Sequence, residues 1–234
     1  MSSSMTVTGT FPDNDWNDGC FTSVYVLTGA KSAVNQTGTH YGTPSTRDDT
    51  GTGSITTTQA NSWVLGGASN PGNNVDPVTG VSGTTVLDNT GPASTVGTNF
   101  CTFYAPEAVA GTYTVGVTDT GSNTVALAEI LASGTISHNT SGPSPAWVDD
   151  FGGDNTSTTG TFTPTPGSLL VAIIGADANS GHSATDIQVS DSMGLTWHQL
   201  AFGNSIDGMI MSVFVADVPG SSSPTPSLLM TGIV

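Results

Sequence analysis

Short apolar runs separated by glycine, asparagine and proline recur along the whole chain. In residues 112–118, Tyr113, Val115 and Val117 alternate with small or polar residues. A half-buried antiparallel strand has this period of two. Residues 169–175 are apolar on both faces, which predicts a central, fully buried strand. No window combines a helical period with capping residues, so the pattern predicts an all-β protein.

The predicted strands are short and are bounded by turn residues. They cover residues 21–27, 62–65, 83–87, 99–104, 112–118, 124–131, 168–175, 185–190, 196–201, 209–216 and 227–234. Connections that contain proline, such as 91–92 and 220–226, cannot continue a hydrogen-bonded ladder. Because sandwiches accommodate short strands separated by turns, we expect antiparallel β-sandwich architecture.

Comparison of the chain with itself indicates two related modules. Four pairs of segments match in the same order: 23–29 with 127–134, 56–68 with 161–176, 103–105 with 214–216, and 119–121 with 230–232. The distance between partners grows slightly along the chain, as expected when a loop between strands lengthens. The sequence therefore predicts tandem β-sandwich modules over 36–136 and 137–234, preceded by an N-terminal segment, 1–35.

The repeats are out of phase with the ends of the chain. In this alignment 227–234 correspond to 112–118, so the strand that should follow is missing from the second module, while its counterpart precedes the first. An incomplete sandwich exposes unpaired backbone groups, which proteins avoid. Three arrangements solve this: the early strand closes the second module of its own chain, it closes that of a neighbouring subunit, or the chain is a piece of a longer one. Pairing at the edge of the first module would remove the problem altogether. The residues of this candidate interface strand are Val24, Tyr25, Val26 and Leu27.

The charge of the chain excludes several classes of partner. It has 2 basic residues, Lys31 and Arg47, against 18 acidic ones, and its formal net charge is −16. So few cations cannot neutralise a run of phosphates or hold an anionic membrane surface, so no nucleic-acid partner is expected. The sequence lacks an apolar run of about 18 residues, so we expect no membrane insertion. The first residues also lack the basic and apolar regions of a secretory signal.

Residues suited to catalysis are few, and the sequence predicts no enzyme. The histidines, at 40, 138, 182 and 198, do not have the spacing of metal ligands. The nucleophile elbow, the P-loop and the dinucleotide fingerprint are absent from the sequence. A glycoside hydrolase would need two carboxylates in one cleft, whereas the acidic pairs here fall in polar loops.

The best candidate for a cation site is the segment before the first long predicted strand. Carboxylates and amides at alternate positions, followed by glycine, are what a calcium ion selects. The candidate ligands are Asp13, Asp15, Asn17 and Asp18. No bidentate glutamate follows at the far end of the segment, so an Asx-rich turn without a cofactor is the favoured interpretation.

The cysteines and tryptophans complete the set of candidates. Cys20 and Cys101 could form a bridge, but the absence of a signal peptide favours buried or free thiols over a disulfide. Trp63 lies within an apolar run and is predicted to be a core residue. Trp147 lies in a polar segment and is the candidate for stacking on a sugar ring.

Several series of residues resemble modules of minor tail and other virion proteins from phages of actinobacteria. They are Trp16-Asn-Asp-Gly19, Val24-Tyr-Val-Leu-Thr-Gly-Ala30 and Ser62-Trp-Val-Leu-Gly-Gly-Ala68, followed by the second-module series at 167–172, 189–194, 196–197 and 212–216. The resemblance implies β-sandwiches of the jelly-roll or lectin-like kind and a structural or host-recognition role. It implies no catalytic residues.

We therefore expect an acidic structural protein on the virion surface, in the tail, a fibre or the head decoration. Its partners would be copies of itself, as a homo-oligomer, and other virion proteins. Synthesis in the host cytoplasm and release by lysis would explain the missing signal peptide. The alternative is a carbohydrate-binding module that recognises host-surface glycans through Trp147 and nearby loops.

Overall fold

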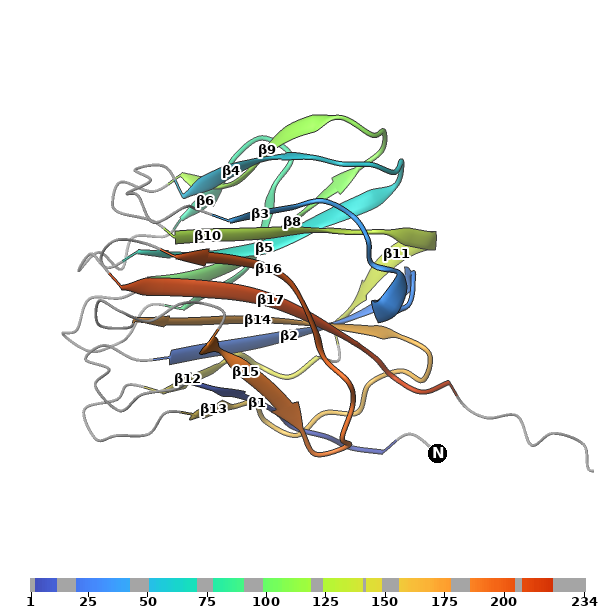
Figure 1. Ribbon diagram of the computed structural model, residues 1–234, viewed down its shortest axis with the longest axis vertical. Coiled ribbons are helices and arrows are strands. Elements are labelled where there is room, and N and C mark those ends of the chain that lie inside the picture. The colour runs from blue at the N-terminus through green and yellow to red at the C-terminus, as the bar shows by residue number, and fades with distance from the viewer. Residues whose placement is uncertain are drawn as a thin grey trace, which may run out of the picture.

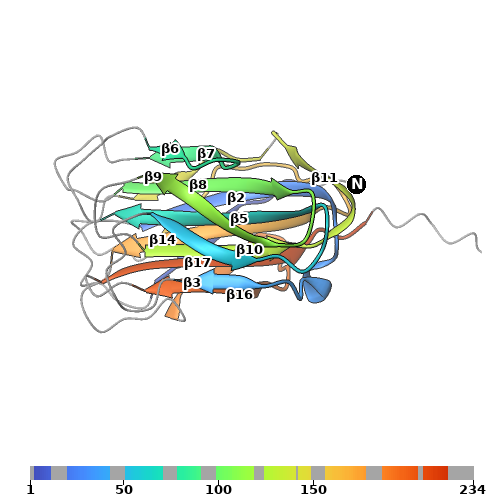
Figure 2. The same ribbon diagram turned by 90° about the horizontal axis from the view of Figure 1, so that it is seen from above.

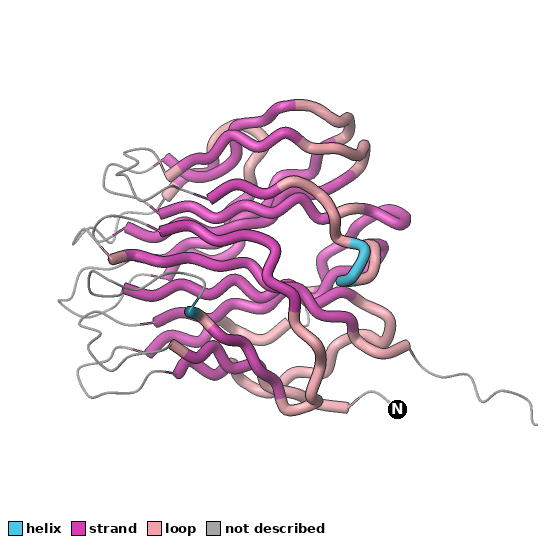
Figure 3. Tube along the Cα trace, viewed as in Figure 1, coloured by secondary structure: helices cyan, strands magenta, loops and turns pink. Residues whose placement is uncertain are grey.

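The structure is a computed structural model that describes residues 3–11, 20–42, 51–70, 78–90, 99–118, 124–140, 142–148, 156–177, 186–204 and 208–220. Antiparallel strands account for nearly all of the regular structure in these ranges (Figure 3). A short 3-10 helix, η1 (Ala33–Asn35), is the longest helical element in them. The prediction of an all-β protein is confirmed.

Four sheets are stacked face to face (Figure 1). Outer sheet I contains β4 (Thr52–Thr56), β9 (Thr112–Thr118) and β6 (Thr79–Gly80). Inner sheet II contains β3 (His40–Gly42), β10 (Thr124–Ile130), β5 (Ser62–Asn70), β8 (Asn99–Glu107) and β7 (Thr85–Thr90). Inner sheet III contains β11 (Ala132–Asn139), β2 (Cys20–Ala30), β14 (Leu169–Asp177), β17 (Met209–Asp217) and β16 (His198–Asn204), and β12 (Ala146–Val148) also pairs with β2. Outer sheet IV contains β13 (Thr156–Thr158), β1 (Val7–Thr10) and β15 (Gln188–Asp191).

Three apolar cores fill the spaces between these sheets. Sheets I and II enclose one outer core and form the first sandwich, and sheets III and IV enclose the other and form the second sandwich. The third core lies between sheets II and III, so the two sandwiches share an apolar cluster at their central face. Figure 2 looks down the stack and shows the inner strands lying nearly side by side in direction, across the direction in which the sheets are stacked.

Strand β14 shows why the inner sheets are apolar on both faces. Leu169, Val171 and Ile173 point into the central core, while the alternating Leu170, Ala172 and Ile174 point into the outer core of the second sandwich. The strand lies between β2 and β17. The prediction of a central, doubly buried strand over 169–175 is confirmed, because the period of two serves a separate core on each face.

The two N-terminal strands complete the second sandwich. β2 pairs with β14 on one side and with β11 and β12 on the other. β1 lies between β13 and β15. In the first sandwich β9 and β10 hold the corresponding places, with β9 between β4 and β6 and β10 beside β5. The second sandwich is thus circularly permuted, and the early strand closes it within its own chain.

The structure also adjusts the internal alignment. Phe103 and Phe214 hold equivalent places, as the alignment has them, and each faces the outer core of its sandwich. In the structure, Ile130 of β10 holds the place equivalent to Leu27 of β2. The alignment made on sequence alone differs from this by one residue. A slip of one residue would turn each side chain to the opposite face. β1 occupies the place assigned to 227–234, a segment outside the described residues.

The central core is tightly packed where β14 crosses β8. Phe21 of β2 stacks on Phe100 of β8, with ring centroids 5.6 Å apart. A Cβ atom at Gly175 would lie 2.5 Å from a ring carbon of Phe100. The absence of a side chain at this position lets the two inner sheets approach each other.

Candidate binding groove

A groove of about 720 Å³ opens at one end of the central core. Its walls come from the turn before β5, from the end of β8 and from the start of β11. The chain changes sandwich here: β10 ends at Ile130 in sheet II and β11 begins at Ala132 in sheet III. The sequence placed the module boundary at 136, whereas the sheets change at Leu131. The groove therefore lies at the junction of the two sandwiches.

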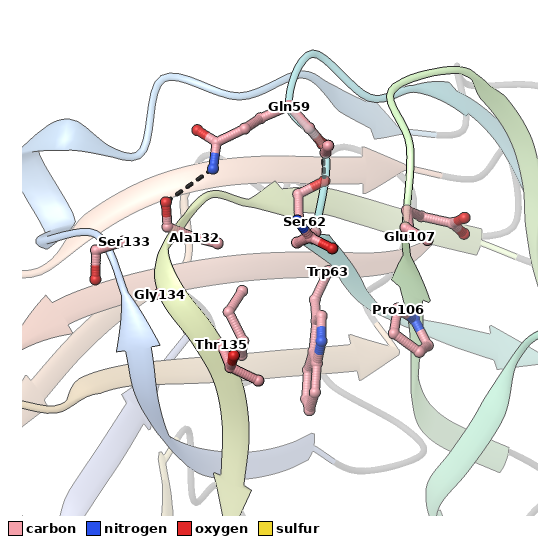
Figure 4. A pocket seen from close by; sticks show the side chains of 13 residues that line it. Gln59, Ser62, Trp63, Pro106, Glu107, Ala132, Ser133, Gly134 and Thr135 are labelled. Atoms are coloured by element: carbon pink, nitrogen blue, oxygen red, sulfur yellow. Dashed lines mark hydrogen bonds between the residues drawn. The ribbon is translucent and has the colours of Figure 1, made fainter.

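Trp63 is the largest side chain in the groove. It is half-buried at the rim of the central core, and its ring stacks on Tyr104 of β8 with centroids 4.5 Å apart and an interplanar angle of 20°. Figure 4 shows the indole standing between Thr135 of β11 and Pro106 of β8. The prediction that Trp63 is a core residue is therefore only half right, because β11 leaves part of the ring uncovered.

The turn that leads into β5 is held by a buried carboxylate. Glu129 is 1% exposed, and its side chain accepts hydrogen bonds from the backbone N–H groups of Thr39 (3.1 Å), Thr58 (2.8 Å) and Gln59 (3.1 Å). The hydroxyl of Thr58 donates a further bond of 2.9 Å. Burial by itself raises the pKa of Glu129, but these donors together lower the pKa below its usual value. The carboxylate is therefore charged, and it fixes the upper edge of the groove.

Gln59 and Ser62 join this turn to the rest of the groove. The side-chain amide of Gln59 donates a 2.8 Å bond to the backbone carbonyl of Ala132, across the mouth of the groove (Figure 4). The hydroxyl of Ser62 donates a 2.9 Å bond to the carbonyl of Gln59. These contacts connect the first sandwich to the start of β11, so the groove walls are fixed relative to each other.

The opposite wall is an irregular stretch of β11. The register between β11 and β2 shifts between Ala132 and Ser137, and the residues from Ser133 to Thr135 are exposed. At Gly29 of β2, φ is 75°, and a Cβ atom there would lie 2.0 Å from the carbonyl oxygen of Thr135. Glycine at this position lets the bulged backbone pass close to β2.

Glu107 lies at the rim of the groove but does not point into it. Figure 4 shows its carboxylate directed away from Trp63. Burial raises the pKa of Glu107 above its usual value, and a hydrogen bond from the Tyr113 hydroxyl offsets part of that rise. The pKa values of the two glutamates of the chain are therefore shifted in opposite directions, upward for Glu107 and downward for Glu129.

A second polar cluster lies between sheets II and III. The carboxylate of Asp88 accepts hydrogen bonds from the hydroxyls of Ser23 (2.7 Å), Thr102 (3.3 Å) and Tyr25. Burial and then the charge of Asp88 raise the pKa of Tyr25 well above its usual value, so the phenol stays neutral. His138 packs edge-on against Tyr25 at 5.4 Å, and burial lowers its pKa although Asp88 opposes this. The cluster joins the two sandwiches through hydrogen bonds from β2 and β8 to Asp88 of β7.

The residues predicted as a site from sequence lie elsewhere. Asp13, Asp15, Asn17 and Asp18 are outside the described residues. Among the residues that are described, no group of three or more His, Cys, Asp or Glu could hold a metal ion. The described part of the chain also contains no helix long and apolar enough to cross a membrane.

The candidate interface strand and the candidate sugar-stacking residue are both found in sheet III. Val24, Tyr25, Val26 and Leu27 are buried in β2, which pairs with β14 on one side and with β11 and β12 of its own chain on the other. Trp147 lies in β12 opposite Phe21 of β2. Neither lies among the groove residues, which come from β5, β8 and β11.

Cys20 and Cys101 are buried thiols that form no disulfide, as the sequence favours. Cys20 faces the outer core of the second sandwich, and Cys101 faces that of the first. The two inner sheets and the central core separate them. A bridge within the chain, which the sequence alone allowed, is therefore excluded by the fold.

Comparisons with known proteins add no relative. A scan against protein-family models, a search of curated proteins and a search of solved structures found no match for this chain.

Proposed function

We propose that this protein is a structural subunit on the surface of a phage particle, and that it assembles through a sheet edge. The resemblance of its sequence to virion modules supports the proposal, and so does the free edge of sheet II. Strand β7 has one pairing partner, β8, among the described strands. In the second sandwich the equivalent strand, β16, lies close to β3 and β10 of sheet II. A strand from a neighbouring subunit would pair with β7.

The charge of the chain supports association through backbone pairing and apolar contact. With 2 basic and 18 acidic residues, copies of this chain repel one another electrostatically. Salt screens such repulsion, with a Debye length of about 10 Å at 0.1 M. Self-association should therefore be unchanged or strengthened as the salt concentration rises.

A lysine on the free edge tests the proposal. Asn89 is exposed on β7, and a lysine there hinders pairing with a further strand. Val34, 67% exposed in η1, gives a matched control because Val34→Lys changes the net charge equally away from any sheet edge. Sedimentation equilibrium of the full chain should show that Asn89→Lys weakens self-association about 10-fold or more, while Val34→Lys does not. A wild-type chain that dissociates as salt is raised would contradict the proposal.

A further inference from the structure

We propose that the groove around Trp63 binds a neutral saccharide. The site is distinct from Trp147, and the proposal stands whether or not the chain belongs to a virion. Its basis is an aromatic face held rigidly beside polar groups that have unused hydrogen-bonding capacity, with no cation in the lining.

The indole of Trp63 supplies a platform of the kind that a sugar ring contacts. Pyranose rings carry C–H groups on one face and hydroxyls around their edge, so they combine an apolar face with a polar rim. Stacking on Tyr104 covers one face of the Trp63 ring and fixes its orientation. Thr135 flanks the ring on the side of β11 (Figure 4). A ligand entering between Trp63 and β11 would meet the ring and the exposed residues of the bulge together.

Polar groups on both walls can serve the hydroxyls of such a ligand. Gln59 uses its amide N–H on Ala132, which leaves its carbonyl oxygen as an acceptor. Ser133 donates its hydroxyl to the carbonyl of Ala30 and keeps its lone pairs. The hydroxyl of Thr135 and the indole N–H of Trp63 have no partner among the described residues. The groove therefore presents donors and acceptors together, as a polyhydroxy ligand requires.

The charge of the groove favours a neutral ligand over an anionic one. Among the described residues of its lining, Glu107 is the only one with an ionisable side chain, and it points away from Trp63. None of these lining residues is a Lys, Arg or His that could pair with a sialic acid, a uronate or a phosphate. The net charge of −16 opposes the approach of any anion. Binding to a neutral saccharide should accordingly change little with salt.

The groove is also rigid before a ligand arrives. Three hydrogen bonds from Thr58 and Gln59 to Glu129 hold the turn, and the Gln59–Ala132 bond links it to β11. Walls that are ordered in the free protein lose little conformational entropy on binding.

The test is a glycan array probed with the full chain, followed by calorimetric titration of the best ligand. The array carries neutral hexose and N-acetylhexosamine oligosaccharides beside sialylated and uronate-containing ones. We expect binding to neutral glycans that Trp63→Ala weakens about 10-fold or more and Trp63→Phe weakens less. Thr135→Val, which replaces the hydroxyl with a methyl group of similar size, should weaken binding by about 3-fold to 10-fold. Trp147→Ala is the control and should bind as the wild type does.

Three results would overturn the proposal: no binding of the wild-type chain to any neutral glycan, a preference for anionic glycans, or unchanged affinity in Trp63→Ala. Circular dichroism melts establish that each variant is folded, and Trp63→Phe keeps the stack with Tyr104 should Trp63→Ala fail to fold. Binding by a chain that is absent from phage particles would support the groove and contradict the proposed function, so the two proposals can fail separately.

Discussion

Replacing Glu129 tests how the groove is held, because one buried carboxylate organises its upper edge. In Glu129→Ala, three backbone N–H groups and one hydroxyl lose their acceptor. Thr58 is exposed and Thr39 and Gln59 are partly so, which lets water replace much of what is lost. At about 1 kcal/mol for each bond, the free energy of unfolding should fall by roughly 3–4 kcal/mol at pH 7.

The loss should depend on pH with a definite sign. The pKa of Glu129 is lowered in the folded protein, so its charged form is favoured by folding. That contribution is present above the unfolded pKa of about 4.3, and it disappears as the pH falls through the lower folded value. The difference in unfolding free energy between the wild type and Glu129→Gln should therefore shrink below about pH 4.

The other glutamate provides a matched control. The pKa of Glu107 is raised, so wild-type stability relative to Glu107→Gln should be greatest below the unfolded pKa and should decline as the pH rises through the folded value. Urea unfolding, followed by tryptophan fluorescence at several pH values, measures both variants. A loss of less than about 1 kcal/mol for Glu129→Ala at pH 7 would refute the reasoning, as would the same direction of pH dependence in both glutamine variants.

Three further predictions concern the cores. Tyr25→Phe removes a donor from the half-buried carboxylate of Asp88 between the inner sheets, and urea unfolding should show a loss of about 1–3 kcal/mol. Gly175→Ala places a methyl group 2.5 Å from the ring of Phe100 and should cost about 1–3 kcal/mol by overpacking; an unchanged melting temperature would contradict this. Cys20 and Cys101 should resist a thiol reagent in the native protein and should both react after unfolding, with no change in stability on adding a reductant.

Much of the fold could be predicted from the sequence, because a strong period of two along a strand indicates which of its faces is buried. The apolar run at 169–175 contributes to the central core and to the outer core of the second sandwich. Val115 and Val117, two residues apart on one face of their strand, both lie in the outer core of the first sandwich. The short strands β1, β4 and β13 were not predicted, since three to five residues carry too little pattern. Many residues of β2 and β10 are small and similar to their neighbours. The alignment of these two strands on sequence alone was therefore wrong by one position.

The groove could not be found from sequence for a different reason. Trp63 belongs to an apolar strand, and its exposure depends on where the chain leaves sheet II at the end of β10 and enters sheet III as β11. That crossing depends on contacts between segments far apart in the chain, such as Gln59 with Ala132. The sequence around Gln59 and Trp63 gives no local signal that these residues lie against β11.

The most direct test of the central proposal is whether the chain lies on the outside of phage particles. Particles would be purified from a lysate of the phage that encodes it, labelled with gold-conjugated antibodies against the purified chain, and viewed by electron microscopy. The account predicts regular labelling of intact particles at the tail, a fibre or the head surface. Mass spectrometry of the same particles that finds no trace of the chain, or labelling confined to disrupted particles, would contradict it.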